Sequence, residues 1–162
     1  MYDYQFRDEA FAAWVLIHQT WHAMRRSEER ILAKIGLTPE KNEVLWVASD
    51  HPSPVTPAKI SCALFRENQT VAGLLNRMEK ENLVTRVPKR KGRPFTEVKV
   101  TVKGQQLSNQ AKATDLAYID KIMSCLSVEE IKQLKKLLRK IRQNALEELR
   151  TELLPPPSWT RI

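Results

Sequence analysis

The chain has 162 residues, which suits one domain with a hydrophobic core and an additional oligomerisation element. Apolar residues make up 42% of it, and this share excludes general disorder. The formal net charge of +8 favours a polyanionic partner. The first residues lack the basic segment of a signal peptide, and the apolar runs are too short to span a membrane. We therefore expect a cytoplasmic protein without membrane contact.

The first predicted element is a long helix over residues 6–35. Phe11, Trp14 and Trp21 fall near heptad positions on one face, and Gly36 is a favourable C-terminal stop. One small domain has little with which to cover so much apolar surface. We therefore interpret this helix as a dimerisation element that a second subunit covers.

Two histidines on this helix lie one turn apart. His18 and His22 share a face with Trp21 and Arg25. No third ligand stands nearby, which disfavours a metal pair, and we predict no metal. Two interpretations stay open. The histidines pack in the core or at the subunit interface, or they bind an acidic or aromatic effector, because imidazole holds a phenol or a carboxylate.

A threonine followed by a proline marks the start of each of the next two helices. Thr38-Pro39 opens a helix that runs to about Ser49, and Thr56-Pro57 opens the following one. The threonine hydroxyl caps free N–H groups of the first turn, and proline fits the first helical position. The helix beginning at Pro57 is the first of a closely spaced pair.

This pair is joined by the turn Arg66-Glu67-Asn68. The second helix of the pair carries apolar residues at three-to-four-residue spacing, namely Val71, Leu74, Leu75 and Met78. Its other face is polar, small or basic and consists of Asn68, Gln69, Thr70, Gly73, Asn76 and Arg77. Two helices joined by so short a turn form a helix-turn-helix, and the polar face fits a helix that reads a DNA major groove.

Two β-branched, alternating runs follow, at residues 83–87 and 96–101. Between them lies a turn segment with four cations. From Arg86 to Lys103 there are seven basic residues against one acid, Glu97. Adjacent cations repel one another and lose hydration when buried, so solvent or phosphate must surround them. A β-hairpin with a basic tip beside a helix-turn-helix predicts a winged helix.

These motifs resemble the MarR-type transcriptional regulators. The matching residues are Gly36-Leu37-Thr38, Thr70-Val71, Asn76-Arg77-Met78-Glu79, Leu83-Val84-Thr85-Arg86 and Val100-Thr101-Val102-Lys103-Gly104. The resemblance extends over about residues 11–149 and implies a winged-helix dimer that binds operator DNA. The chain departs from the family in two places: Asn82 replaces the usual glycine before the first wing strand, and the wing lacks the usual aspartate. Asparagine also tolerates the left-handed conformation that ends a helix.

The C-terminal part is predicted to be helical. One helix runs from Gly104 to about Leu126, and a capping box at residues 127–130 opens the last helix. The last helix has an apolar seam of Ile131, Leu134, Leu138, Ile141 and Ala145, which favours helix–helix packing. Cys62 and Cys125 match no metal spacing and stand among apolar residues, so we expect buried free thiols.

The predicted fold is mainly α with a small β-hairpin wing, a winged helix-turn-helix flanked by long dimerisation helices. We expect four segments: an N-terminal dimerisation helix (1–35), a DNA-binding lobe (36–104), C-terminal dimerisation helices (105–150) and an extended tail (151–162). The predicted function is that of a DNA-binding transcriptional regulator, by resemblance usually a repressor, which binds a pseudo-palindromic operator as a homodimer.

The predicted DNA contacts lie on the helix-turn-helix and the wing. They are Thr56, Pro57, Asn68, Gln69, Thr70, Gly73, Asn76, Arg77, Arg86, Lys89, Arg90, Lys91 and Arg93. Asparagine and glutamine suit adenine edges, and Arg77 suits phosphate or guanine. Arg93 is expected in the minor groove, and the other wing cations at phosphates.

The resemblance also implies a small aromatic or anionic effector, bound between the dimer helices and the DNA-binding lobe. The predicted lining is His18, Trp21, His22, Arg25, Trp46 and Tyr118. No glycine-rich phosphate loop and no Gly-x-Ser-x-Gly or His-Glu-x-x-His motif is present, so we predict no cofactor and no enzyme. The alternative is a winged-helix module for protein contact or nonspecific nucleic-acid binding. An enzyme based on His18 or His22 is disfavoured, because neither has a partnered nucleophile.

Overall fold

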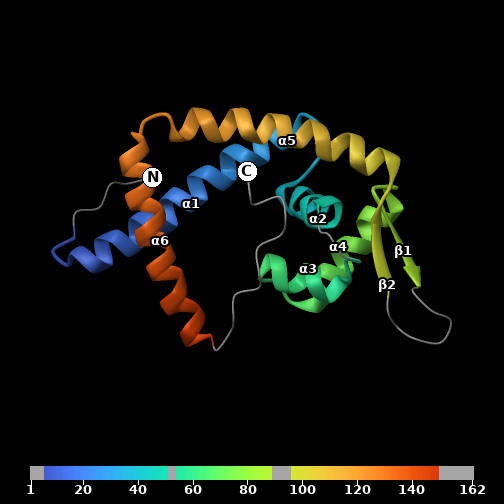
Figure 1. Ribbon diagram of the computed structural model, residues 1–162, viewed down its shortest axis with the longest axis horizontal. Coiled ribbons are helices and arrows are strands. Elements are labelled where there is room, and N and C mark those ends of the chain that lie inside the picture. Colours follow the sequence, from blue (N-terminus) through green and yellow to red (C-terminus); the bar gives the residue numbers. More distant parts are fainter. Residues whose placement is uncertain (1–5, 51–53, 89–95, 150–162) are drawn as a thin grey trace.

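The computed structural model describes residues 6–50, 54–88 and 96–149. Within these ranges it contains α1 (Glu9–Ala33), α2 (Pro39–Asp50), α3 (Pro57–Leu64), α4 (Asn68–Lys80), β1 (Val84–Pro88), β2 (Thr96–Val100), α5 (Val102–Met123) and α6 (Val128–Glu148) (Figure 1). The predicted fold class is confirmed. The boundary predicted at Gly104 lies inside α5, since this helix begins two residues earlier than expected.

The helix starts follow the side chains that cap them. Thr56 Oγ1 accepts a hydrogen bond from the Lys59 N–H at 3.3 Å, and Pro57 is the first residue of α3. At α6, Ser127 Oγ accepts from the Glu130 N–H at 3.3 Å, while Glu130 Oε2 accepts from the Ser127 N–H at 2.7 Å. This reciprocal pair is the predicted capping box. These starts are therefore determined locally.

Residues with positive φ end several of the helices. Gly36 follows α1 with φ 76°, and Asn82 follows α4 with φ 58°, as predicted for this asparagine. Phe65 ends α3 with φ 51°, which is uncommon for a bulky side chain. The next residue, Arg66, donates its N–H to Ser61 O at 3.0 Å and so closes the turn. The connection to α4 is short for this reason.

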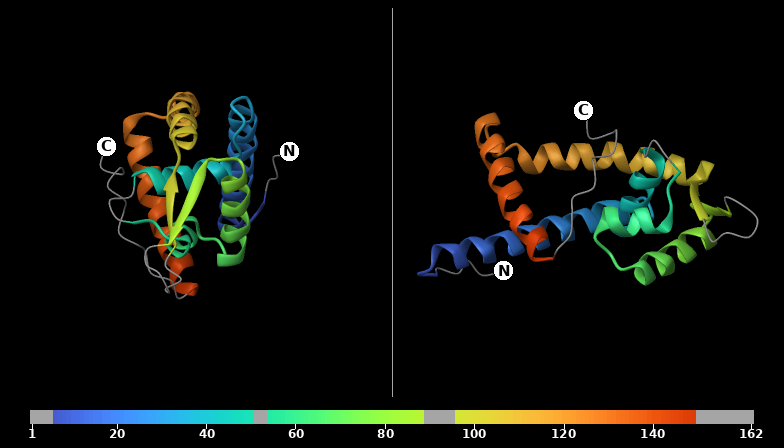
Figure 2. Two further views of the ribbon diagram at one scale, coloured as in Figure 1. Left: turned by 90° about the vertical axis from the view of Figure 1, so that its right-hand side faces the viewer. Right: turned by 60° about the horizontal axis from the view of Figure 1, so that its bottom comes forward.

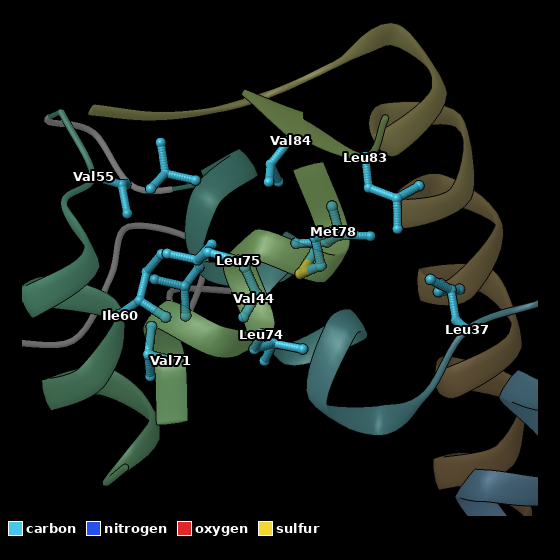
Figure 3. Close-up of a cluster of buried hydrophobic side chains, with 14 of the residues drawn as sticks. Leu37, Val44, Val55, Ile60, Val71, Leu74, Leu75, Met78, Leu83 and Val84 are labelled. Carbon is cyan, nitrogen blue, oxygen red and sulfur yellow. The ribbon is translucent and has the colours of Figure 1, made fainter. Parts of the chain in front are cut away.

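One hydrophobic core holds α2, α3, α4 and the hairpin together. Figure 3 shows its side chains converging from these elements. The buried members include Val44, Leu45, Val55, Ile60, Val71, Leu74, Leu75, Met78, Leu83, Val84 and Val98. The predicted inner face of α4 therefore faces this core, and the four elements form one lobe.

The hairpin is antiparallel and is anchored to the lobe. Val84 pairs with Val100 and Pro88 pairs with Thr96 at the two ends of the register. The Val98 N–H donates to Val55 O at 2.8 Å, which joins β2 to the segment before α3. The wing predicted from the alternating runs is thus present, and its base is fixed to the helix-turn-helix.

The long helices leave apolar surface uncovered. Trp14 and Trp21 of α1 are 56% and 57% exposed. On α5 and α6 the exposed apolar residues include Leu116, Ile119, Ile122, Leu134, Leu137, Leu138 and Ile141. Helix α6 lies at the end of the molecule opposite the hairpin (Figures 1 and 2). The seams that the sequence assigns to dimerisation are therefore accessible to a second copy.

The prediction for the cysteines is wrong. Cys62 and Cys125 are both exposed. Ile60 and Ser61 take the inward positions of α3, so Cys62 points outward near the end of that helix. Cys125 lies in the turn between α5 and α6, where its apolar sequence neighbours do not cover it.

Gly104 is required by close packing between α5 and the hairpin. A Cβ at this position would lie 2.1 Å from Leu83 O and 2.8 Å from Val100 Cγ1. We expect Gly104→Ala to destabilise the fold by about 1–3 kcal/mol, because backbone must move to admit the methyl group. Urea unfolding measures this, with the exposed Gln106→Ala as the matched control on the same helix. Equal stability of the two variants would contradict the packing.

Candidate nucleic-acid interface

The outer face of α4 is open along its whole length. Asn68, Gln69, Thr70, Asn76 and Arg77 are exposed, and Gly73 is half-buried between them. The opposite face is buried in the core of the lobe. The structure thus brings together the six residues of α4 that were predicted to contact DNA.

Arg86, predicted to neutralise a phosphate, is paired with a carboxylate inside the lobe. Its N–H, Nε and Nη2 donate to the Glu79 carboxylate at 3.1, 3.0 and 2.6 Å. These hydrogen bonds hold the pKa of Glu79 below its usual value. Because Glu79 lies on α4 and Arg86 on β1, the pair fixes the first wing strand against the candidate reading helix. The guanidinium therefore has a partner within the lobe.

The remaining predicted contacts fall in two places. The Thr56 hydroxyl caps α3 and Pro57 begins it, so both stand at the N-terminal end of this helix. Lys89, Arg90, Lys91 and Arg93 lie outside the described residues. Their assignment to phosphates and the minor groove stays a prediction from the sequence.

A buried guanidinium connects α1 with α2. Arg25 is 13% exposed; its Nη2 lies 2.5 Å from Glu40 Oε1 and its Nη1 lies 2.9 Å from Glu43 Oε1. A third carboxylate, Glu28, is 3.5 Å away on α1 itself. The same two α2 carboxylates also lie 3.9 and 3.7 Å from Nη2 of Arg66, in the turn before α4. We call Arg25, Glu40, Glu43 and Arg66 the carboxylate bridge.

The ionisation of this bridge reflects opposing effects. Burial disfavours the charge on Arg25, but the hydrogen bond and charges of its carboxylate partners outweigh it and raise its pKa. Burial would likewise raise the pKa of Glu40; hydrogen bonds from its own backbone, Thr38 and Arg25 lower it instead. At Glu28 burial prevails over Arg25, and the pKa is raised. The bridge is thus charged where α1 meets α2.

An open surface pocket of about 310 Å³, which we call the cavity, lies between α1 and α5. It is lined by Ser27, Ile31, Thr114, Ala117, Tyr118, Lys121 and Ile122. Tyr118 donates its hydroxyl to Met24 O at 3.1 Å, and Lys121 is exposed. A space of this size is near the lower end of known ligand sites. Its mixed apolar, hydroxyl and cationic lining suits a small aromatic anion.

Only Tyr118, of the six predicted effector residues, lines this cavity. His18 and His22 are exposed and contact their neighbouring tryptophans, with ring centroids 4.6 Å from Trp14 and 4.9 Å from Trp21. Trp46 is half-buried on α2. Arg25 belongs to the carboxylate bridge, so it is not the free cation expected for an anionic effector.

The other lining residues were missed in the sequence. Thr114, Tyr118 and Lys121 follow one another at spacings of four and three along α5, which places them on one face. This spacing is visible in the sequence, but a solvent-exposed face of a helix shows the same spacing. The contribution of Ser27 and Ile31 depends on which face of α1 meets α5, and no local signal indicates that.

A buried polar pair joins α2 with α5. Asn42 Nδ2 donates to Asp115 Oδ2 at 2.7 Å, and the two residues are 3% and 7% exposed. Burial raises the pKa of Asp115, although the hydrogen bond from Asn42 opposes this. Among the described residues Asn42 Oδ1 has no hydrogen-bond partner. Asp115 follows Thr114 of the cavity lining, so α5 contacts the lobe beside the cavity.

The described ranges hold no group of three or more histidine, cysteine or acidic side chains arranged to bind a metal ion. No helix in the same ranges has both the length and the apolar character needed to cross a lipid bilayer.

Known protein families and curated sequences give no match to this chain. Solved structures do. The organohalide-sensing transcriptional regulator RdhR, in its 2,4-dichlorophenol-bound form, has a TM-score of 0.81 at 23% identity, over 96% of this chain and 98% of that one. MepR of S. aureus in complex with DNA has a TM-score of 0.75 at 23% identity, over 81% and 96%.

A third similar structure is AbsC, a MarR family transcriptional regulator from Streptomyces coelicolor. It has a TM-score of 0.79 at 19% identity, over 88% of this chain and 98% of that one. The chain therefore has the fold of the MarR-type winged-helix regulators, and the resemblance carried by residues 36–104 is confirmed at the level of fold.

The buried Asp115 generates a pH-dependent prediction. The pKa of Asp115 in the folded protein is raised above its ordinary value of 3.8. Its contribution to the free energy of unfolding is therefore fully present below pH 3.8 and is lost as the pH rises through the pKa of the folded state. At pH 7 the charge costs stability. Asp115→Asn removes it, and the new amide can donate to Asn42 Oδ1. We expect a gain of about 1 kcal/mol at pH 7 that shrinks toward pH 4.

Urea unfolding at several pH values measures this difference. Asp120→Asn, at an exposed position on the same helix, is the matched control and is expected to change little. An Asp115→Asn variant that loses stability at pH 7, or gains the same amount at every pH, would show that the carboxylate is not the destabilising group.

Proposed function

We propose that this chain is a DNA-binding transcriptional regulator that acts as a homodimer on a pseudo-palindromic operator. The observation that carries this proposal is the outer face of α4, where Asn68, Gln69, Asn76 and Arg77 stand exposed on a helix whose other face is buried. Asparagine and glutamine amides pair with adenine edges, and arginine pairs with guanine or phosphate. The net charge of +8 suits the same polyanion.

The uncovered apolar surface supports the homodimer. Trp14 and Trp21 of α1 and Leu134 and Leu138 of α6 are exposed in the single chain, at the positions that form heptad-like seams. A second copy presents the same surfaces and covers them by symmetry. The dimer then carries two α4 helices, which can enter successive major grooves on one side of the duplex.

The similar proteins favour the same function. MepR is described as a complex with DNA, and RdhR and AbsC are transcriptional regulators. We propose repression as the direction of control and the cytoplasm as the location. The alternative is a winged-helix module that binds proteins or coats nucleic acid without sequence preference, and the experiment below separates the two.

Selection of bound duplexes from random DNA tests the proposal. A dimer with two reading helices is expected to enrich an inverted repeat whose half-site centres are about 10–11 base pairs apart, with a footprint that survives raised salt. Recovery of a single unpaired half-site would contradict the dimeric arrangement. If the protein binds all DNA sequences with equal affinity and releases all of them as the salt concentration rises, it is the nonspecific nucleic-acid-binding module.

We further propose that the cavity between α1 and α5 binds a small phenolic or aromatic acid. Its lining combines the Tyr118 ring and Ile31 with the Lys121 ammonium at the edge. The RdhR structure contains 2,4-dichlorophenol, a ligand of this chemical class. We retain Tyr118 from the predicted set and assign the cationic role to Lys121 instead of Arg25, because Arg25 already has its carboxylate partners.

Release of the selected operator by aromatic acids tests the cavity. We expect a chlorinated phenol or a hydroxybenzoate to weaken operator binding, and Lys121→Ala to reduce affinity for the anionic ligand about tenfold while operator affinity stays unchanged. Calorimetry gives the ligand affinity directly. Lys132→Ala, on the exposed surface of α6, is the control. Unchanged binding of the acid to Lys121→Ala would remove this cavity as its site.

A further inference from the structure

The glycines of the described ranges stand at their positions for different structural reasons. Gly36 has φ 76°, a conformation that other residues rarely adopt. Gly104 packs so closely on Leu83 that no Cβ fits. The fold of the single chain therefore explains both of these positions.

Gly73 is explained by neither reason. It lies in the middle of α4, its φ is not positive, and a Cβ built on it would meet no atom of the described residues within 4 Å. Glycine in a helix interior is less stable than alanine, because it loses more backbone freedom on folding. Gly73 thus lowers the stability of α4, and the packing of the described residues does not require it.

The surroundings of Gly73 indicate what comes close to it. Gln69 precedes it by four residues, and Asn76 and Arg77 follow by three and four, so these exposed polar side chains surround it on one face. Asparagine is short, and its amide reaches a base edge only when the helix backbone lies deep in the groove. A missing Cβ between these side chains permits that depth.

We propose that Gly73 is the point of closest approach between α4 and the operator, and that it is a specificity-determining position. The inference rests on the proposed DNA-binding function. The duplex lies against the bare backbone of α4 where a Cβ would otherwise stand. Because α4 then lies deeper in the major groove, Gln69 and Asn76 come within reach of base edges. Discrimination between bases therefore depends on Gly73, although it has no side chain.

The test is Gly73→Ala, for which stability and binding are expected to move in opposite directions. The melting temperature should rise by about 1–3 °C, because alanine favours the helix. Affinity for the selected operator should fall by about tenfold or more, and affinity for scrambled duplex should fall much less. Gly73→Ser should lower operator affinity further, since its side chain is longer. Fluorescence titration on both duplexes and thermal unfolding give the two readouts.

Ala113→Gly is the matched control, because Ala113 is exposed on α5, away from α4. It should lower the melting temperature and leave operator affinity unchanged, which shows that helix stability alone does not set binding. Sedimentation of each variant should show the same oligomeric state as the wild-type chain.

Three outcomes would overturn the inference. If Gly73→Ala binds the operator as tightly as the wild-type chain, no close approach occurs there, while the DNA-binding function stands. If Gly73→Ala melts lower or changes its oligomeric state, the glycine serves folding or assembly instead. If the wild-type chain selects no duplex at all, the proposed function fails, and this inference fails with it.

Discussion

The contact between the long helix α1 and α2 is made by one half-buried guanidinium with its carboxylate partners. Arg25 is 13% exposed, and a charge at this depth is tolerated only with close counter-charges. Glu40 and Glu43 supply them from α2 at 2.5 and 2.9 Å. Without Arg25, the carboxylates of Glu40 and Glu43 would repel one another, and without the two carboxylates the half-buried guanidinium would be left without its α2 partners. The crossing of α1 over α2 is therefore strongly specified.

The same two carboxylates also lie near the turn that leads into α4. They lie within 4 Å of Arg66, whose backbone N–H also closes the turn before α4. On the other side of α4, Glu79 holds Arg86 of β1. Helix α4 is thus connected to α1 at its beginning and to the wing near its end. In the proposed dimer, with α1 at its interface, such connections would relate the two α4 helices to one another and so bear on the spacing of the proposed operator half-sites.

Helix α5 has two neighbours with different chemistry. Towards α1 it lines the cavity with Tyr118 and Lys121, and towards α2 it carries Asp115, bonded to Asn42. A ligand that moved α5 relative to α1 would therefore act on a buried polar contact with the lobe, at residues next to one another in the chain. Buried polar contacts are directional and sensitive to small displacements. This arrangement gives the proposed effector a short physical route to the DNA-binding lobe.

The sequence by itself determined the elements, because their signals are local. The caps at Thr56 and Ser127, the stop at Gly36 and the apolar spacing on α4 act within a few residues, and each was found where predicted. The ordered series from helix-turn-helix to wing was likewise sufficient for the fold. Only the tertiary structure decided which charges meet. Arg25 and Arg86 looked like free cations in the sequence, and the outward direction of the two cysteines was not visible there. The two carboxylate partners of Arg25 on α2 stand 15 and 18 residues away along the chain. An ion pair depends on distance through space, which for these partners only the packing of helices defines.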